Sequence, residues 1–216
     1  MKRKCLWFAA LVVMAVLGFT LAFYSQLPAQ VPVHWNGAGE IDRYGPRSWL
    51  LAFSVIMAFV LFVWTLLPKI SPAEFSVEPF AATYWQIGLM IICLLGYIQC
   101  VVVWGAYSPS MQMNRALFGG IAIMLGLLGN VMGKVRRNFW IGIRTPWTLA
   151  SERVWYSTHR FAAKTMVVGA LLSLAAIWIG LPLSVCLGLA LAGPIIPAFY
   201  SLVIYKRLER SGKLEA

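Results

Sequence analysis

Charged residues are scarce in this chain, and acidic residues are the scarcest. Only 12% of its 216 residues are charged while 61% are apolar, and 7 aspartates and glutamates stand against 18 lysines and arginines. About a quarter of the residues of a typical soluble domain are charged. The shortage of polar surface excludes an ordinary water-soluble globule and indicates that the solvent is the lipid bilayer.

Clusters of metal-binding or redox residues are also lacking. The four cysteines lie in or at the ends of apolar segments, and none has the spacing of a zinc site or of a secreted disulfide framework: Cys5, Cys93, Cys100 and Cys186. The two histidines, His34 and His159, lie far apart in the sequence. We therefore expect no metal and no cofactor, and packing roles for the cysteines.

Long apolar runs are what the chain has instead. A bilayer-spanning helix takes about 20 predominantly apolar residues, and we expect an all-α integral membrane protein with six transmembrane helices in a single domain, 1–216. The first run is longer than a signal-peptide core, so we expect it to be retained as an anchor. The absence of ionisable residues near the middle of any run argues against a pump or an ion-coupled transporter. The runs are 5–23, 48–67, 85–107, 116–132, 165–180 and 184–205.

Basic residues gather on one side of this arrangement. If the N-terminus is cytoplasmic, only Arg43, Arg47 and Arg115 fall outside the cell. This bias predicts a multi-pass protein of the bacterial plasma membrane with both termini in the cytoplasm. Because the basic residues sit at membrane edges, we expect membrane lipids as partners and no direct nucleic-acid binding.

One long connection, 25–47, is predicted to be a structured external loop. Its VPVHW segment alternates and favours a short extended piece. His34 could bind a metal with Glu40 and Asp42, but the favoured interpretation is that His34 and Trp35 cap the outer helix ends at the headgroup level, since these residues lack a repeated ligand spacing.

The other long connection, 134–164, is predicted to be an amphipathic cytoplasmic loop. Thr145-Pro146 and Ser151 are good helix starts, and a helix from Ser151 would lie in the interface or lead straight into the fifth span. One side would carry Val154, Trp155, Thr158, Phe161, Ala162 and Thr165, and the other Arg153, Ser157, Arg160 and Lys164.

A third stripe of this helix carries Glu152, Tyr156 and His159. Such a set could perform acid–base chemistry or bind a metal, but no nucleophile or second carboxylate accompanies it. We expect these side chains to tie the loop together by hydrogen bonds, and we do not expect an enzyme.

Both loops resemble known sequences. LPAQVPVHWNGAGEIDRYGPR resembles the N-terminal module (1–67) of many bacterial membrane proteins, and GNVMGKVRRNFWIGIRTPWTLASERVWYSTHRFAAK resembles the signature (116–205) of SdpI-like proteins, which are immunity proteins against a sporulation-delaying peptide toxin. Gly133 stands where the related pattern has proline. The outer motif falls on Pro32, His34, Trp35, Asn36, Gly39, Asp42 and Gly45, and the signature on Asn130, Asn138, Gly142, Arg144, Thr145, Pro146, Trp147, Thr148, Glu152, Trp155, His159 and Lys164.

The resemblance implies protection against a secreted membrane-active peptide toxin and capture of a cytoplasmic repressor. We hypothesise that the peptide meets the external loop and changes how the cytoplasmic loop is displayed. A small peptide or lipid transporter built from two inverted three-helix halves is the alternative. The external ligand-binding candidates are His34, Trp35, Asn36, Ile41, Asp42 and Tyr44, and the cytoplasmic partner-binding candidates are Arg144, Trp147, Glu152, Arg153, Trp155, His159 and Arg160.

Overall fold

The computed structural model describes residues 2–36, 38–108 and 111–214, and it is mostly helical. Six of its helices are long and apolar enough to cross a membrane, which confirms the six predicted spans. They are α1 (Lys2–Phe23), α2 (Ser48–Ile70), α3 (Ala81–Tyr107), α4 (Met113–Met132), α6 (Glu152–Trp178) and α7 (Leu183–Arg210).

The fifth spanning helix, α6, begins well before the apolar run that predicted it. Ser151 caps its N-terminus by accepting a hydrogen bond from the Val154 N–H at 3.4 Å, and the helix then continues without a break to Trp178. The amphipathic segment therefore leads straight into the membrane span, which was one of the two arrangements expected. Because no proline or glycine interrupts residues 152–168, nothing in the sequence separates the basic turns from the apolar ones.

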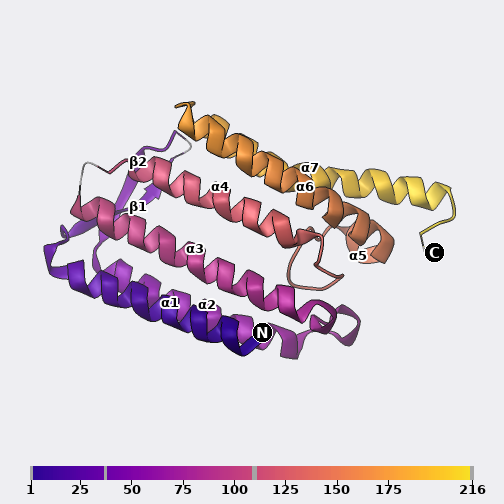
Figure 1. Ribbon diagram of the computed structural model, residues 1–216, viewed down its shortest axis with the longest axis horizontal. Coiled ribbons are helices and arrows are strands. Elements are labelled where there is room, and N and C mark those ends of the chain that lie inside the picture. Colours follow the sequence, from indigo (N-terminus) through magenta and orange to yellow (C-terminus); the bar gives the residue numbers. More distant parts are fainter. Residues whose placement is uncertain (1, 37, 109–110, 215–216) are drawn as a thin grey trace.

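The helices form two groups of three. Helices α1, α2 and α3 pack on one another, α4, α6 and α7 form the other group, and α3 joins the groups by lying against α4 (Figure 1). Glycines allow the close approach of α6 and α7, since a Cβ on Gly169 would lie 2.7 Å from the Leu189 carbonyl oxygen and one on Gly193 only 2.8 Å from the Met166 Cα. The inverted repeat stays a prediction.

Two short elements occupy opposite ends of the molecule. Strands β1 (Gln30–Trp35) and β2 (Ile41–Pro46) pair as an antiparallel hairpin at one end, while α5 (Pro146–Ala150) and the C-terminal end of α7 lie at the other, and α1 begins on the side away from the hairpin (Figure 1). The predicted external loop is thus a two-stranded hairpin, an addition to the all-helical expectation. Three single turns complete the fold: η1 (Tyr24–Gln26), η2 (Ala73–Phe75) and η3 (Glu78–Phe80).

The hairpin tip rests on the second group of helices. Gly39 has φ +83°, and a Cβ there would lie 2.2 Å from Leu183 Cδ1 and 3.4 Å from Asn114 Cβ. The backbone conformation favours glycine at this position, and any side chain there would also displace the end of Leu183. The hairpin therefore belongs to the first group in sequence but contacts the second in space.

Candidate functional site

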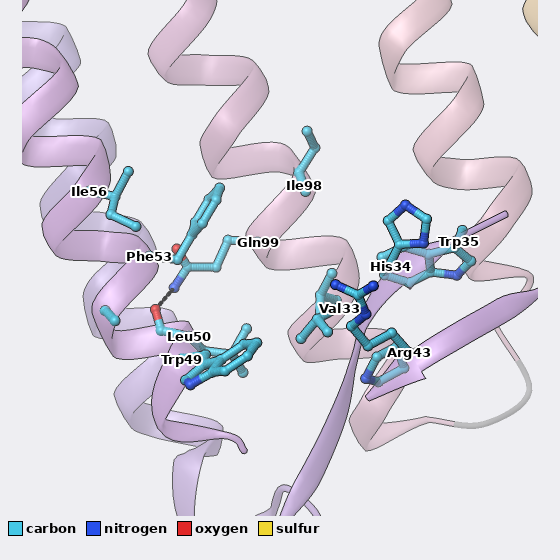
Figure 2. A pocket seen from close by; sticks show the side chains of 13 residues that line it. Val33, His34, Trp35, Arg43, Trp49, Leu50, Phe53, Ile56, Ile98 and Gln99 are labelled. Atoms are coloured by element: carbon cyan, nitrogen blue, oxygen red, sulfur yellow. Dashed lines mark hydrogen bonds between the residues drawn. The ribbon is translucent and has the colours of Figure 1, made fainter. Parts of the chain in front are cut away.

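A groove of about 500 Å³ lies between the hairpin, α2 and α3 (Figure 2). Its walls are almost entirely apolar, and we call it the hairpin groove. His34 and Arg43 stand on the hairpin side and Gln99 lies on α3, while the other lining residues are Pro32, Val33, Trp35, Trp49, Leu50, Ala52, Phe53, Ile56, Ile98 and Val102. A volume of a few hundred Å³ with apolar walls and few polar groups suits an apolar ligand or segment.

Arg43 brings to this groove a positive charge that no ion pair of the described residues engages. Its side chain is exposed, and within the described residues no hydrogen bond or ion pair engages it. His34, beside it, is already engaged, because its Nδ1 lies 2.5 Å from Asp42 Oδ1 on the neighbouring strand. The groove therefore combines an apolar interior with one free cation.

Gln99 fixes the floor of the hairpin groove. Its side chain is 1% exposed, and its Nε2 lies within hydrogen-bond distance of Thr20 Oγ1 (2.7 Å), Ser54 Oγ (2.9 Å) and the Leu50 carbonyl (3.0 Å). An amide nitrogen has only two hydrogens, so the three acceptors share them. The network ties α1, α2 and α3 together where α2 forms the groove wall.

The predicted external residues are not all brought to one site. Trp35 lines both the hairpin groove and a second hollow on the other side of the hairpin, where Ile41 and Tyr44 lie. Asn36 stabilises the tip, since its Oδ1 accepts the backbone N–H groups of Ala38 and Glu40.

Sequence reasoning missed the helical walls of the groove, which are the side chains of Trp49, Phe53, Ile56 and Gln99. Of these, only Gln99 carried a signal, as a polar residue inside an apolar run.

At the opposite end, Asn138 organises the loop that follows α4. The side chain is completely buried, and its Oδ1 accepts the N–H groups of Trp140 and Ile141, both at 2.8 Å. Its Nδ2 donates to the carbonyls of Arg136 and Ile141, both at 2.9 Å. All the hydrogen bonds that an amide side chain commonly makes are therefore used inside one tight turn.

His159 holds the same loop against α6. Its ring stacks on Trp155 with centroids 4.0 Å apart, and both side chains are 1% exposed. Its Nε2 accepts the Ile143 N–H at 3.0 Å, so the proton of a neutral ring sits on Nδ1, which donates to the Trp155 carbonyl at 2.8 Å. Both ring nitrogens are occupied, which leaves neither free for acid–base chemistry in this arrangement.

Gly142 is the residue that lets the loop approach His159. It has φ +110°, and a Cβ there would lie 2.4 Å from His159 Nε2. The predicted stripe of Glu152, Tyr156 and His159 is therefore divided, because His159 turns inward while the other two are exposed.

The predicted helix start at Thr145-Pro146 is confirmed as α5. Thr145 and Thr148 form a reciprocal capping box, and Thr148 Oγ1 also donates to the Ile143 carbonyl at 2.8 Å. Thr145 Oγ1 lies 2.8 Å from Ser201 Oγ, which attaches this short helix to α7.

The partner-binding candidates separate into an exposed set and a buried set. Arg144, Glu152, Arg153 and Arg160 are exposed and Trp147 is half-buried. Trp155 lies inside the fold, where its Nε1 donates to the Val135 carbonyl at 2.8 Å. Trp155 and His159 thus support the loop from within and do not face a soluble partner in this arrangement.

The exposed arginines are partly occupied by the chain itself. The Arg144 guanidinium donates to the Phe139 carbonyl, and Arg153 donates to the Lys213 carbonyl at 3.3 Å. Arg137, which sequence reasoning missed, links this loop to η2 by donating to Glu74 at 2.9 Å and to the Leu149 carbonyl at 2.9 Å. Its signal in the sequence was only that of one more basic residue at a membrane edge.

In comparison with known sequences, the C-terminal and N-terminal parts of the chain match two different protein-family models. Residues 134–204 match the model of the SdpI/YfhL protein family, and residues 11–58 match a domain of unknown function, DUF1648. The first match covers α5, α6 and most of α7, and the second covers the hairpin with most of α1 and the first half of α2.

Two relatives extend this result. The chain is 25% identical to the Immunity protein SdpI of Bacillus subtilis (strain 168) over 204 residues, which cover 93% of this chain and 96% of the relative. It is 42% identical over 52 residues to an uncharacterized protein of Archaeoglobus fulgidus, covering 22% of this chain and 28% of that protein. No solved structure matches the chain.

Proposed function

We propose, on the premise that this multi-pass membrane protein carries an SdpI/YfhL family domain, that it protects its own cell from a secreted, membrane-active peptide. The similarity to an immunity protein along nearly the whole chain supports this function. The hairpin groove is the single observation that carries the mechanism, because it offers an apolar binding surface at one end of the membrane-spanning helices.

The chemistry of the groove suits a peptide of this kind. A membrane-active peptide is apolar along most of its surface, so its transfer into the groove is driven by burial against side chains such as Phe53 and Ile56. Trp35 and Trp49 are amphipathic and suit the membrane–water interface. The free cation of Arg43 would attract an acidic side chain or a terminal carboxylate of the peptide. Binding would hold the peptide at the protein and keep it from disrupting the bilayer.

The proposal extends to the opposite end of the molecule. We place the termini and the loop with Arg144, Glu152, Arg153 and Arg160 in the cytoplasm, where these exposed groups are available to a repressor protein. Peptide binding would release or retain that repressor only if the peptide prefers one arrangement of the loop. No chemical reaction is assigned to the chain.

Filling the hairpin groove tests the protective function. Ala52 is exposed and lines the groove, so Ala52→Phe is expected to occupy the space of the peptide and leave the fold intact. Excluding one apolar side chain of the peptide from the groove removes about 1.5–3 kcal/mol of burial, and we therefore expect roughly tenfold to hundredfold weaker peptide binding and a matching loss of survival. The measurement is survival of cells exposed to the peptide at matched membrane levels of wild type and variant.

Ala58→Phe is the matched control. Ala58 is an exposed residue of the same helix that does not line the hairpin groove, so cells making this variant should survive as well as the wild type. Equal protection by Ala52→Phe and wild type would remove the groove from the mechanism.

A small peptide or lipid transporter is the second candidate, favoured by the division into two groups of three helices. Proteoliposomes distinguish the two functions. Peptide that stays on the protein in a fixed ratio supports immunity, and peptide that accumulates in the lumen supports a carrier.

Accessibility labelling tests the proposed orientation. In a cysteine-free background, Tyr44→Cys on the hairpin should react with an impermeant maleimide added outside intact cells, while Ala150→Cys at the end of α5 should react only after lysis. Both positions are exposed in the fold, so a difference in labelling reports the membrane side. Labelling of Ala150→Cys from outside would reject both the orientation and capture of a cytoplasmic repressor.

A further inference from the structure

A shallow hollow of about 340 Å³ lies between α6 and α7. Its α6 residues belong to the first turns of that helix, next to α5 in the sequence, and Figure 1 shows α5 at this end of α6. Two cations and a set of hydroxyl and aromatic groups line it: Tyr156, Ser157, Arg160, Phe161, Lys164 and Tyr200. The ring centroids of Phe161 and Tyr200 lie 4.8 Å apart and connect the two helices at the hollow.

The side chains of Arg160 and Lys164 form no ion pair with an acidic residue within the described part of the chain. Arg160 Nη1 donates to the Tyr156 hydroxyl at 2.6 Å, and its guanidinium lies 5.2 Å from the centre of the same ring. The ion pairs of residues 2–36, 38–108 and 111–214 include neither Arg160 nor Lys164. An anion entering the hollow would therefore meet one positioned guanidinium, whose remaining N–H groups are available, and one free ammonium.

The same face of α6 becomes apolar immediately beyond the hollow. Tyr156, Arg160, Lys164 and Val168 recur every fourth residue, and Leu171 continues the row three residues later. Val168 is 53% and Leu171 62% exposed. About one helical turn, four residues or roughly 6 Å, separates the last cation from the first exposed apolar side chain.

The neighbouring helix runs antiparallel to α6, since Tyr200 packs on Phe161 and the Gly193 carbonyl accepts from Thr165 Oγ1. At the level of Val168 it carries Leu191, which is 39% exposed. The surface therefore changes from cationic to apolar over a few ångströms, as an amphiphile does from headgroup to tail. The apolar row lies within a membrane-spanning helix, so an amphiphile matches both parts of the surface, and Arg160 is then engaged by the lipid and not by the repressor proposed above.

We infer that this surface is a binding site for an anionic phospholipid. The phosphodiester would lie between Arg160 and Lys164 with hydrogen bonds from Tyr156 and Ser157, and the acyl chains would cover Val168 and Leu171. Basic pockets between membrane helices at the cytoplasmic surface are recognised places for such headgroups. The bound lipid would brace α6 against α7 beside the loop that His159 holds.

Lipid retention during purification tests this site. Wild type is reconstituted in bilayers with equal amounts of phosphatidylglycerol and phosphatidylcholine, extracted in detergent, and analysed for bound lipid by mass spectrometry. Wild type should retain phosphatidylglycerol in preference. The Arg160→Gln/Lys164→Gln double variant should retain about thirtyfold less, because each cation near the surface contributes about fivefold, on the order of 1 kcal/mol. Lys164→Gln alone, at an exposed position, should show an intermediate loss and gives a second reading if the double variant folds poorly.

Two comparisons make the result decisive. Lys134→Gln/Arg136→Gln removes two exposed cations from the same end but outside the hollow, and it should keep the wild-type preference. Soluble glycerol phosphate in excess should not displace the lipid, because it lacks the acyl chains. Undiminished retention by Lys164→Gln and the double variant, an equal loss in the control variant, or full displacement by glycerol phosphate would each overturn the lipid site.

Discussion

Replacing Gly142 by alanine is expected to destabilise the loop between α4 and α5 severely. Two costs add, since the backbone at φ +110° is strained for any residue with a side chain and the new Cβ would lie 2.4 Å from His159 Nε2. Together they amount to roughly 2–5 kcal/mol. His159 Nε2 would be displaced from the Ile143 N–H, leaving this half-buried donor without its acceptor. Thermal unfolding of the purified protein in detergent measures the loss.

Gly180→Ala separates the two costs. Gly180 also has a positive φ, +81°, but a Cβ there would meet only Arg115 Nη2 at 3.7 Å. This control carries the backbone strain without the collision, and we expect it to cost about 1 kcal/mol. An equal fall in melting temperature for the two variants would mean that the contact with His159 does not support the loop.

The second large effect is expected from Asn138→Ala. The substitution removes four hydrogen bonds and leaves the N–H groups of Trp140 and Ile141 without an acceptor inside the protein. Unsatisfied buried groups cost about 1–3 kcal/mol each, and we expect a total loss of roughly 3–5 kcal/mol. Denaturation in detergent and the amount of folded protein in the membrane report the change, and protection against the peptide should fall with it.

Asn114→Ala is the comparison for this prediction. Asn114 also accepts a local backbone hydrogen bond, from the Arg115 N–H at 2.7 Å, but it is only half-buried and water can replace the lost group. We expect a change within about 0.5 kcal/mol. If Asn138→Ala unfolded at the same temperature as Asn114→Ala, the turn around residue 138 would have to be held by other contacts.

The spans and helix starts could be predicted because their causes are local. An apolar run of sufficient length defines a membrane helix wherever its neighbours lie, and the capping hydroxyls of Thr145 and Ser151 act on N–H groups within three residues. The extended conformation of VPVHW could also be predicted, because its side chains alternate in character along the segment, and this segment forms most of β1.

The candidate sites could not be predicted in the same way, since they depend on which faces meet. The hairpin groove brings together residues from Pro32 to Val102, and no local pattern reports that α2 and α3 flank the hairpin. His159 lies on the same helical stripe as Glu152, but helical spacing alone does not indicate whether the His159 side chain points into the protein. Only the close approach of Gly142, which is a tertiary contact, decides that it does.

Helix α7 touches both ends of the molecule. Its first residue, Leu183, supports the hairpin tip at Gly39, and Ser201 is hydrogen-bonded to Thr145 at the start of α5. Eighteen residues at 1.5 Å each separate these two contacts by about 27 Å. If α7 moved as one body, a displacement of the hairpin at Leu183 would also displace Ser201 and its hydrogen bond to Thr145, and Pro194 and Pro197, which lie between the two contacts, would set how much of the displacement arrives.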